Sequence, residues 1–193
     1  MLPTWQLENL TIDRLAALAD RLISFHEAHL GQSEPDSGRS PNASLVIGLC
    51  GALGVGKTTF TQYLGKRMGV AASEVISPTF VLLRSHRGNR CHLHHLDAYR
   101  VQDDDEWWET GIDECFDDPG TVTVVEWADR FPNSMPRDTL WLRLRDQPTG
   151  SPETENGAGS ELRSMSVHAS TPMLSDWIQA AWTLDAQQEV PRS

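Results

Sequence analysis

An almost unbroken apolar run at residues 44–50 is followed by a glycine-rich segment and then by a helical pattern. The run, Ser-Leu-Val-Ile-Gly-Leu-Cys, has the composition of a strand that is buried on both faces. After the glycine-rich segment, Phe60, Leu64 and Met68 recur at helical spacing, and Gly69 marks the end of that helix. The pattern therefore predicts a strand, a glycine loop and a helix in direct succession.

Other stretches of the chain also have readable periodicity. They predict an amphipathic helix at residues 11–30, a short strand at 75–80 bent by a proline, two strands at 80–86 and 91–96 joined by a hairpin turn, an acidic helix at 103–110, a second buried strand at 121–126, a strand near a sheet edge at 139–145, a return strand at 161–170 and a closing helix at 173–184. Polar segments at 31–43 and 147–159 are expected to be mobile loops.

The glycine segment at residues 51–59 fits the phosphate-binding pattern G-x-x-x-x-G-K-[ST]. Its glycines permit backbone turns that a Cβ would prevent, so that successive N–H groups can face phosphates at a helix N-terminus. Lys57 would place its positive charge against the β- and γ-phosphates, and Thr58 would offer its hydroxyl to Mg²⁺. The expected nucleotide-binding residues of this P-loop are Gly51, Leu53, Gly54, Val55, Gly56, Lys57, Thr58 and Thr59.

Together these elements predict an α/β fold. We expect a P-loop NTPase-like, mostly parallel sheet that is flanked by helices on both faces and extended by an antiparallel hairpin. A single domain is expected to span residues 1–193.

Hydrolysis also requires a placed Mg²⁺ ion and an oriented water, and two carboxylates follow predicted strands. Glu126 ends the strand at 121–126, and Asp97 follows the strand at 91–96, where an open α/β sheet presents its ligand groups. Either carboxylate could hold Mg²⁺ while the other orients the attacking water. The alternative for each is a strand-end cap or an ion pair with a nearby arginine.

Thr79 and Trp127 are weaker candidates for the same site. The Thr79 hydroxyl could sense the γ-phosphate through Mg²⁺, or it could belong to a simple turn. Trp127 could stack on the base or pack in the core, and for a single tryptophan the core is the favoured interpretation.

Three histidines lie on the strand expected at residues 91–96. His92 and His94 would share one face of that strand and His95 the other. Because no cysteine or carboxylate completes a set of metal ligands at suitable spacing, we expect solvated strand histidines.

The composition narrows the class of partner. The 193 residues carry a formal net charge of −11, which argues against unaided binding of nucleic acid or of an anionic membrane. Only two lysines occur, and one of them is Lys57 in the P-loop pattern. Three widely spaced cysteines indicate neither a disulfide framework nor a zinc site. With no visible secretory signal and no apolar run long enough to span a membrane, we expect a cytoplasmic protein.

Several separated motifs together resemble one family, the small bacterial P-loop ATPases of tRNA threonylcarbamoyladenosine synthesis, known as the TsaE (YjeE) family. The matching pieces follow the family's order and spacing within about residues 15–144, at residues 51–59, 77–80, 95–100, 111–112 and 125–127. Where this chain has Ala52, the family often has Asp or Glu.

The resemblance implies specific roles for these residues. Residues 51–59 would bind the ATP phosphates and Mg²⁺, Glu126 would be the Walker B-type acidic residue, and Trp127 would lie close to the nucleotide. Thr79 and Asp97 would act near the γ-phosphate and the metal. The expected catalytic residues are Lys57, Asp97 and Glu126, and the expected metal ligands are Thr58, Asp97 and Glu126.

The resemblance also implies a partner and a reaction. The chain would be a weak ATPase that acts on a heterodimer of TsaB- and TsaD-type proteins, which transfers the threonylcarbamoyl group to adenosine 37 of tRNA. ATP hydrolysis would reset that heterodimer between turnovers, and tRNA would be contacted only indirectly.

Three other functions remain open on the residues alone. A nucleoside or small-molecule kinase would share the P-loop but needs an arginine-rich lid, for which the best candidates are Arg84, Arg87 and Arg90 around the expected hairpin. A regulatory GTPase is disfavoured because no N-K-x-D segment occurs to bind guanine. A nucleotide-dependent scaffold would require that Asp97 and Glu126 support no turnover.

Overall fold

The computed structural model describes residues 4–29, 44–71, 73–78, 81–89, 91–147, 162–172, 174–176 and 178–179. Its elements are, in chain order, β1 (Thr4–Leu10), α1 (Ile12–His29), β2 (Leu45–Cys50), α2 (Lys57–Arg67), β3 (Leu83–Arg87), β4 (His92–Asp97), α3 (Asp104–Glu109), α4 (Ile112–Phe116), β5 (Val122–Glu126), the 3₁₀ helix η1 (Ala128–Arg130), β6 (Leu140–Asp146) and β7 (Arg163–Ala169).

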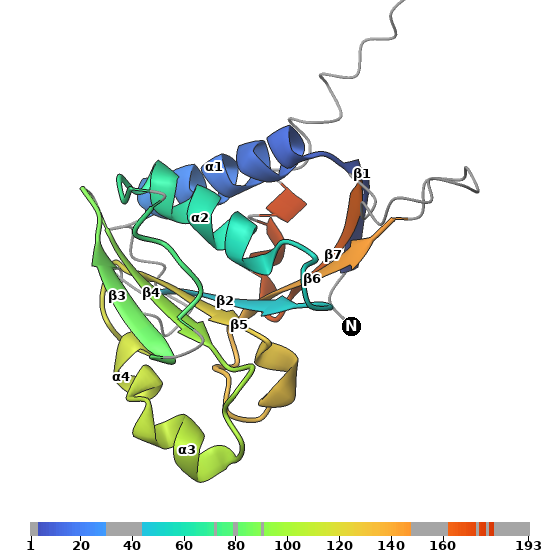
Figure 1. The fold of residues 1–193 in the computed structure, drawn as a ribbon. Coiled ribbons are helices and arrows are strands. Elements are labelled where there is room, and N and C mark those ends of the chain that lie inside the picture. The colour runs from blue at the N-terminus through green and yellow to red at the C-terminus, as the bar shows by residue number, and fades with distance from the viewer. Residues whose placement is uncertain are drawn as a thin grey trace, which may run out of the picture.

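The seven described strands form one sheet in the order β1-β7-β6-β2-β5-β4-β3. The four central strands, β6, β2, β5 and β4, run parallel to one another. The outer strands β3, β7 and β1 each run antiparallel to the neighbour nearer the centre. Helices α1 and α2 lie over one face, and α3 and α4 lie on the other (Figure 1). The predicted fold class, with its β3–β4 hairpin, is therefore confirmed.

The central strand β2 supplies side chains to both faces of the sheet. Leu45, Ile47 and Leu49 join the core beneath α1 and α2, whereas Val46 joins the core beneath α3 and α4. Successive side chains of a strand point to opposite faces, so a strand covered on both sides must be apolar throughout. Because helices cover β2 on both faces, its apolar run is unbroken, and the glycine loop begins where this strand ends at Cys50.

Strand β6 lies inside the sheet, and the expectation that it lies near an edge is wrong. It pairs in parallel with β2 and antiparallel with β7. Leu140, Leu142 and Leu144 are buried, while Trp141 and Arg143 are half-buried on the opposite face. The alternation of apolar and basic residues therefore reflects one less covered face of an interior strand.

Residues 75–78 do not form the expected strand, and residues 79 and 80 lie outside the described part of the chain. The carbonyl oxygen of Val75 accepts a hydrogen bond from Gln62 Nε2 of α2 at 3.0 Å. Pro78 has no N–H to donate to a ladder. A helix side chain thus takes the place of a strand neighbour for this segment.

Strand β1 is an element that the hydrophobic pattern does not predict. Trp5 and Leu7 are partly buried against the core beneath α1 and α2. After them the register with β7 shifts between Leu7 and Leu10, and Asn9 takes a positive φ of 55°. The irregularity leaves only two apolar residues in alternation, which is too short a signal to separate from a loop.

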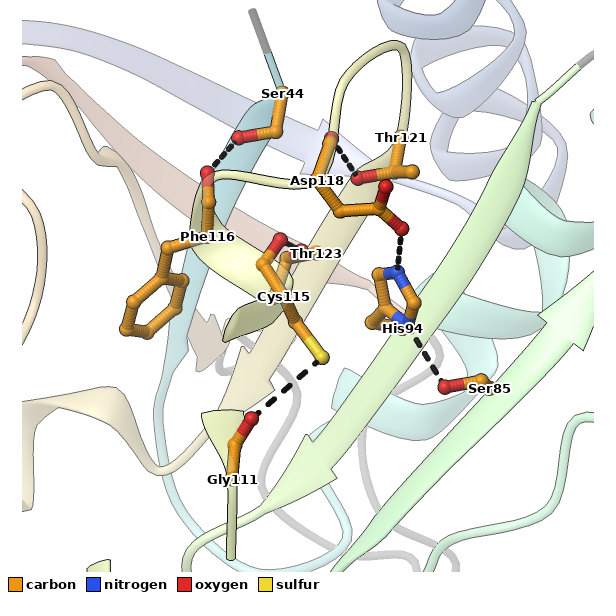
Figure 2. Close-up of polar contacts among 9 residues, drawn as sticks. All are labelled: Ser44, Ser85, His94, Gly111, Cys115, Phe116, Asp118, Thr121 and Thr123. Atoms are coloured by element: carbon orange, nitrogen blue, oxygen red, sulfur yellow. Dashed lines mark hydrogen bonds and ion pairs between the residues drawn. The ribbon is translucent and has the colours of Figure 1, made fainter. Parts of the chain in front are cut away.

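Helix α4 is tied to the sheet by one side chain of β5 and by one from the residue that precedes β2 (Figure 2). The Thr123 hydroxyl of β5 donates to the carbonyl oxygen of Cys115 at 2.9 Å. The Ser44 hydroxyl, next to β2, donates to the carbonyl oxygen of Phe116. Both bonds satisfy carbonyl groups at the C-terminal end of α4, where a helix leaves them without internal partners.

His94 links the β3–β4 hairpin to the loop after α4. Its Nδ1 lies 2.8 Å from Ser85 Oγ on β3, and its Nε2 lies 2.9 Å from Asp118 Oδ2 (Figure 2). The His94 side chain is buried, so the expectation of a solvated histidine is wrong at this position.

The predicted mobile loops and the predicted closing helix fall partly or wholly outside the described residues. The loop at 31–43 lies there entirely, as does the loop at 147–159 except for Gln147. Of the closing helix expected at 173–184, the described residues 174–176 and 178–179 are helical. None of the described helices is both long and apolar enough to cross a membrane.

Candidate functional site

The P-loop (residues 51–59) leaves the carboxyl end of β2 and enters α2 at Lys57. Gly51, Gly54 and Gly56 have φ angles of 138°, 79° and 108°, a region that favours glycine. A Cβ on Gly51 would also lie 2.4 Å from the carbonyl oxygen of Leu144. The glycines of the motif therefore stand where the backbone requires them, and the loop delivers the N-terminus of an 11-residue helix to the sheet edge.

Lys57 is only 5% exposed and lies inside the P-loop. Its Nζ donates to the carbonyl oxygens of Gly51 at 2.8 Å and Ala52 at 2.9 Å. Burial lowers the pKa of the Lys57 ammonium below its ordinary value, and the carboxylates of Glu126 and Asp97 oppose that shift. Both candidate carboxylates therefore favour the charged form of Lys57.

Glu126 connects β5 to the first turn of α2. The residue is buried, and each of its carboxylate oxygens has a partner. Oε2 accepts a hydrogen bond from Thr58 Oγ1 at 2.9 Å, and Oε1 lies 2.8 Å from His95 Nε2. Two residues 68 positions apart in the sequence, Thr58 and Glu126, are thus in direct contact.

Asp97 lies directly opposite Glu126 in the parallel pairing of β4 with β5. Its Oδ2 accepts from Ser77 Oγ at 2.6 Å, and its Oδ1 accepts from the backbone N–H of Tyr99 at 3.0 Å. The second bond is a strand-end cap, which was one of the two interpretations of this residue. The cap also fixes the Asp97 carboxylate at the carboxyl end of β4, beside the end of β5 that carries Glu126.

Trp127 stands at the rim of the site in a strained backbone conformation. It has a φ of 60°, which is uncommon for a bulky residue. Lys57 Nζ lies 3.6 Å from the centre of its ring, and the Tyr99 ring lies 5.0 Å from it at a tilt of 42°. Strained residues of this kind often occur at binding sites, and the half-buried ring contacts the P-loop lysine.

The oxygen atoms gathered here fit Mg²⁺. That ion takes one or two protein carboxylates together with hydroxyl, water and phosphate oxygens. The Thr58 hydroxyl, Glu126 and Asp97 supply such oxygens at one edge of the sheet. Neither here nor elsewhere within the described ranges do three His, Cys, Asp or Glu side chains form a group that could hold a metal ion by itself, so the site would depend on the hydroxyl, water and phosphate oxygens as well.

His95 is a member of the site that the sequence pattern missed. It was expected to be solvated, but its side chain is fully buried against Glu126. His92, by contrast, is exposed. Two signals in the sequence pointed to it: His95 lies two residues before Asp97, on the same face of β4, and it begins the segment 95–100 that resembles the family.

The remaining predicted residues lie at the margins of this arrangement. Leu53 is 77% exposed at the tip of the P-loop, and Thr59 is half-buried on α2. Thr79 lies outside the described residues, so its contact with the γ-phosphate stays a prediction. The lid candidates Arg84 and Arg87 lie on the edge strand β3, and Arg90 is not among the described residues.

Strand β7 supports the P-loop from the side. Arg163 Nε donates to the carbonyl oxygen of Val55 at 3.0 Å and lies 3.3 Å from Asp146 Oδ1 of β6. The Val55 side chain is 1% exposed and packs in the core beneath α1 and α2. Core packing and the guanidinium therefore hold the same residue of the loop.

We expect Arg163→Met to weaken nucleotide binding by about threefold to tenfold, because the loop carbonyl loses a charged donor worth about 1 kcal/mol. Calorimetric titration with ATP, paired with a thermal unfolding curve, measures both effects. The control is Asp146→Asn, which removes the ion pair but keeps the bond from Arg163 to Val55 and should bind normally. Full affinity in folded Arg163→Met protein would refute this support.

Known proteins share both the sequence and the fold of this chain. Residues 15–154 match the family described as Threonylcarbamoyl adenosine biosynthesis protein TsaE. The tRNA threonylcarbamoyladenosine biosynthesis protein TsaE of Treponema pallidum is 36% identical over 116 residues, which are 60% of this chain and 84% of that protein. Its counterpart in Nostoc sp. is 34% identical over 135 residues, covering 65% of this chain and 76% of the relative. The crystal structure of Bacillus subtilis YdiB, at 21% identity, has the same fold, with a TM-score of 0.64 over 96% of this chain and 98% of that chain.

Proposed function

Since this chain belongs to the TsaE family of tRNA threonylcarbamoyladenosine biosynthesis, we propose that it binds and hydrolyses Mg·ATP to drive that pathway. Hydrolysis resets a threonylcarbamoyl-transferring heterodimer between turnovers on adenosine 37 of tRNA. The heterodimer consists of TsaB- and TsaD-type proteins.

The contact between Thr58 Oγ1 and Glu126 Oε2, at 2.9 Å, is the observation that carries this proposal. In phosphoryl transfer by P-loop proteins, the Ser or Thr after the loop lysine and a strand-end carboxylate serve the same metal ion. A hydroxyl and a carboxylate brought together by two different elements are the arrangement that such a shared ion requires. Mg²⁺, when bound, would neutralise charge that develops on the β- and γ-phosphates.

The other residues have roles that follow from their positions. Lys57 exchanges its loop carbonyl partners for phosphate oxygens and stabilises the charge of the transferring group. The backbone N–H groups of the P-loop and of the first turn of α2 bind the phosphates, with the helix dipole in support. Asp97 and Glu126 divide the tasks of holding the metal and orienting the attacking water.

The charge of the protein favours a protein partner over direct contact with tRNA. A net charge of −11 repels a polyanion, so the heterodimer binds the tRNA and this chain acts on the heterodimer. The cytoplasm, where tRNA is modified, is the proposed location.

The test is Mg·ATP hydrolysis by the purified protein, alone and with the heterodimer from the same organism. We expect slow turnover alone and at least about tenfold faster turnover with the heterodimer, which corresponds to about 1.4 kcal/mol in the barrier. A hydrolysis rate that does not change when the heterodimer is added would refute the proposed role in the pathway. Phosphate transfer to a nucleoside or another small acceptor would instead establish a kinase.

A further inference from the structure

We propose that His95 is a positioning residue, which holds the carboxylate of Glu126 in the orientation that receives Mg²⁺ beside Thr58. The inference rests on the proposed function, because it assigns a task within the same nucleotide site. His95 itself touches neither nucleotide nor metal in this role and acts through Glu126.

The geometry fixes both oxygens of one carboxylate from two directions. His95 Nε2 lies 2.8 Å from Oε1, while Thr58 Oγ1 lies 2.9 Å from Oε2. The His95 and Glu126 side chains are 0% and 3% exposed, so water does not compete for the bond between them. A carboxylate held at both ends cannot rotate about its terminal torsion, and its free lone pairs keep one direction.

The hydrogen-bond pattern also locates the proton of the imidazole. An ionised carboxylate only accepts, so Nε2 must carry the hydrogen that points at Glu126. His95 Nδ1 is buried and has no partner among the described residues. An unpaired lone pair at Nδ1 is tolerated more easily than an unpaired N–H, so the neutral Nε2–H tautomer satisfies the whole arrangement.

A simple packing role does not account for a histidine at this position. The strand register places His95 beside Val124 of β5, on the face that also carries the apolar side chains of Leu93 and Val122. An apolar residue would continue that core, but it would leave Oε1 of Glu126 buried without a donor, at a considerable desolvation cost. The histidine supplies the donor that offsets this cost and so allows the carboxylate to be both buried and oriented. Residues that orient a metal ligand in this way commonly contribute 10- to 100-fold to metal affinity.

The test measures how much Mg²⁺ strengthens nucleotide binding, which is the ratio of the affinities for a slowly hydrolysed ATP analogue with Mg²⁺ and with EDTA. His95→Met fills similar space without a donor and should reduce this ratio by about 10- to 100-fold. In His95→Gln the amide nitrogen replaces Nε2 as donor, so most of the ratio should return. His95→Asn is polar but too short to reach Oε1, and it should behave like the Met variant even if that variant folds poorly.

His94→Met provides the matched control. His94 is the adjacent residue on the opposite face of β4, and it is bonded to a different carboxylate, Asp118. The Mg²⁺ ratio should be unchanged in that variant. If the wild-type protein shows no strengthening by Mg²⁺, the proposed function itself fails. If the wild type shows it and both His95→Met and His95→Asn keep it in full, only the positioning role is overturned.

Discussion

Lys57→Ala is expected to lower Mg·ATP hydrolysis by about 100-fold or more, because a preorganised charge that meets the transferring phosphoryl group is removed. Binding should weaken as well. Lys57 is almost fully buried as a residue, and at such a site the attraction between its charge and a phosphate is screened less than at an exposed surface. Steady-state hydrolysis and titration with ATP measure the two losses separately.

The chain contains its own control for this variant. Lys66 is the second of the two lysines and lies in the last turn of the same helix, α2, where it is exposed. Lys66→Ala removes an equal charge from the same element and should leave both measurements within about twofold, as exposed charges contribute little. A Lys57→Ala protein that still bound and hydrolysed ATP normally would refute the assignment of the nucleotide site.

Glu126→Gln is expected to reduce hydrolysis by a comparable factor, about 100-fold, while the protein remains folded. The amide is nearly the same shape, and its oxygen can still accept from Thr58. Its NH₂ group, however, would face His95 Nε2, which could accept only if the imidazole proton moved to the buried Nδ1, where it has no hydrogen-bond partner among the described residues. The negative charge available to a metal or a water is lost as well.

Asp97→Asn, measured in parallel, separates the roles of the two carboxylates. The variant that raises the Mg²⁺ concentration needed for half-maximal rate identifies the metal ligand. The variant that lowers the rate at saturating Mg²⁺ identifies the residue that orients water. Unchanged turnover in both variants would leave a nucleotide-binding scaffold without catalysis.

The parts of this site that lie within one short segment could be predicted from the sequence. The P-loop, its strand and its helix occupy consecutive residues, and each carries its own signal: an apolar run, glycines at fixed spacing and helical periodicity. Glu126 was identifiable for a related reason, since it ends a buried strand and such ends meet at one edge of a parallel sheet.

Contacts between distant segments could not be predicted in this way. His95 reaches Glu126 because β4 lies beside β5, and nothing in the local pattern of either strand specifies that neighbour. The same limit explains why β6 was wrongly expected near an edge of the sheet. An alternating sequence pattern is the same whether the strand pairs with one neighbour or with two. The contact of Arg163 with the P-loop could not be predicted because 108 residues separate it from Val55.

The pairing of β1 with β7 has a consequence for the order in which the protein can form during synthesis. Thr4 pairs with His168 across 164 positions, so β1 has no strand neighbour until almost the whole described chain has left the ribosome. The central unit of β2, α2 and β5 is complete at Glu126, well before His168 has been added. Pairings of such long range are slow to form because closing a large loop costs entropy before any contact is gained. The nascent protein therefore acquires its parallel centre first, and the strand synthesised earliest is among the last to join the sheet.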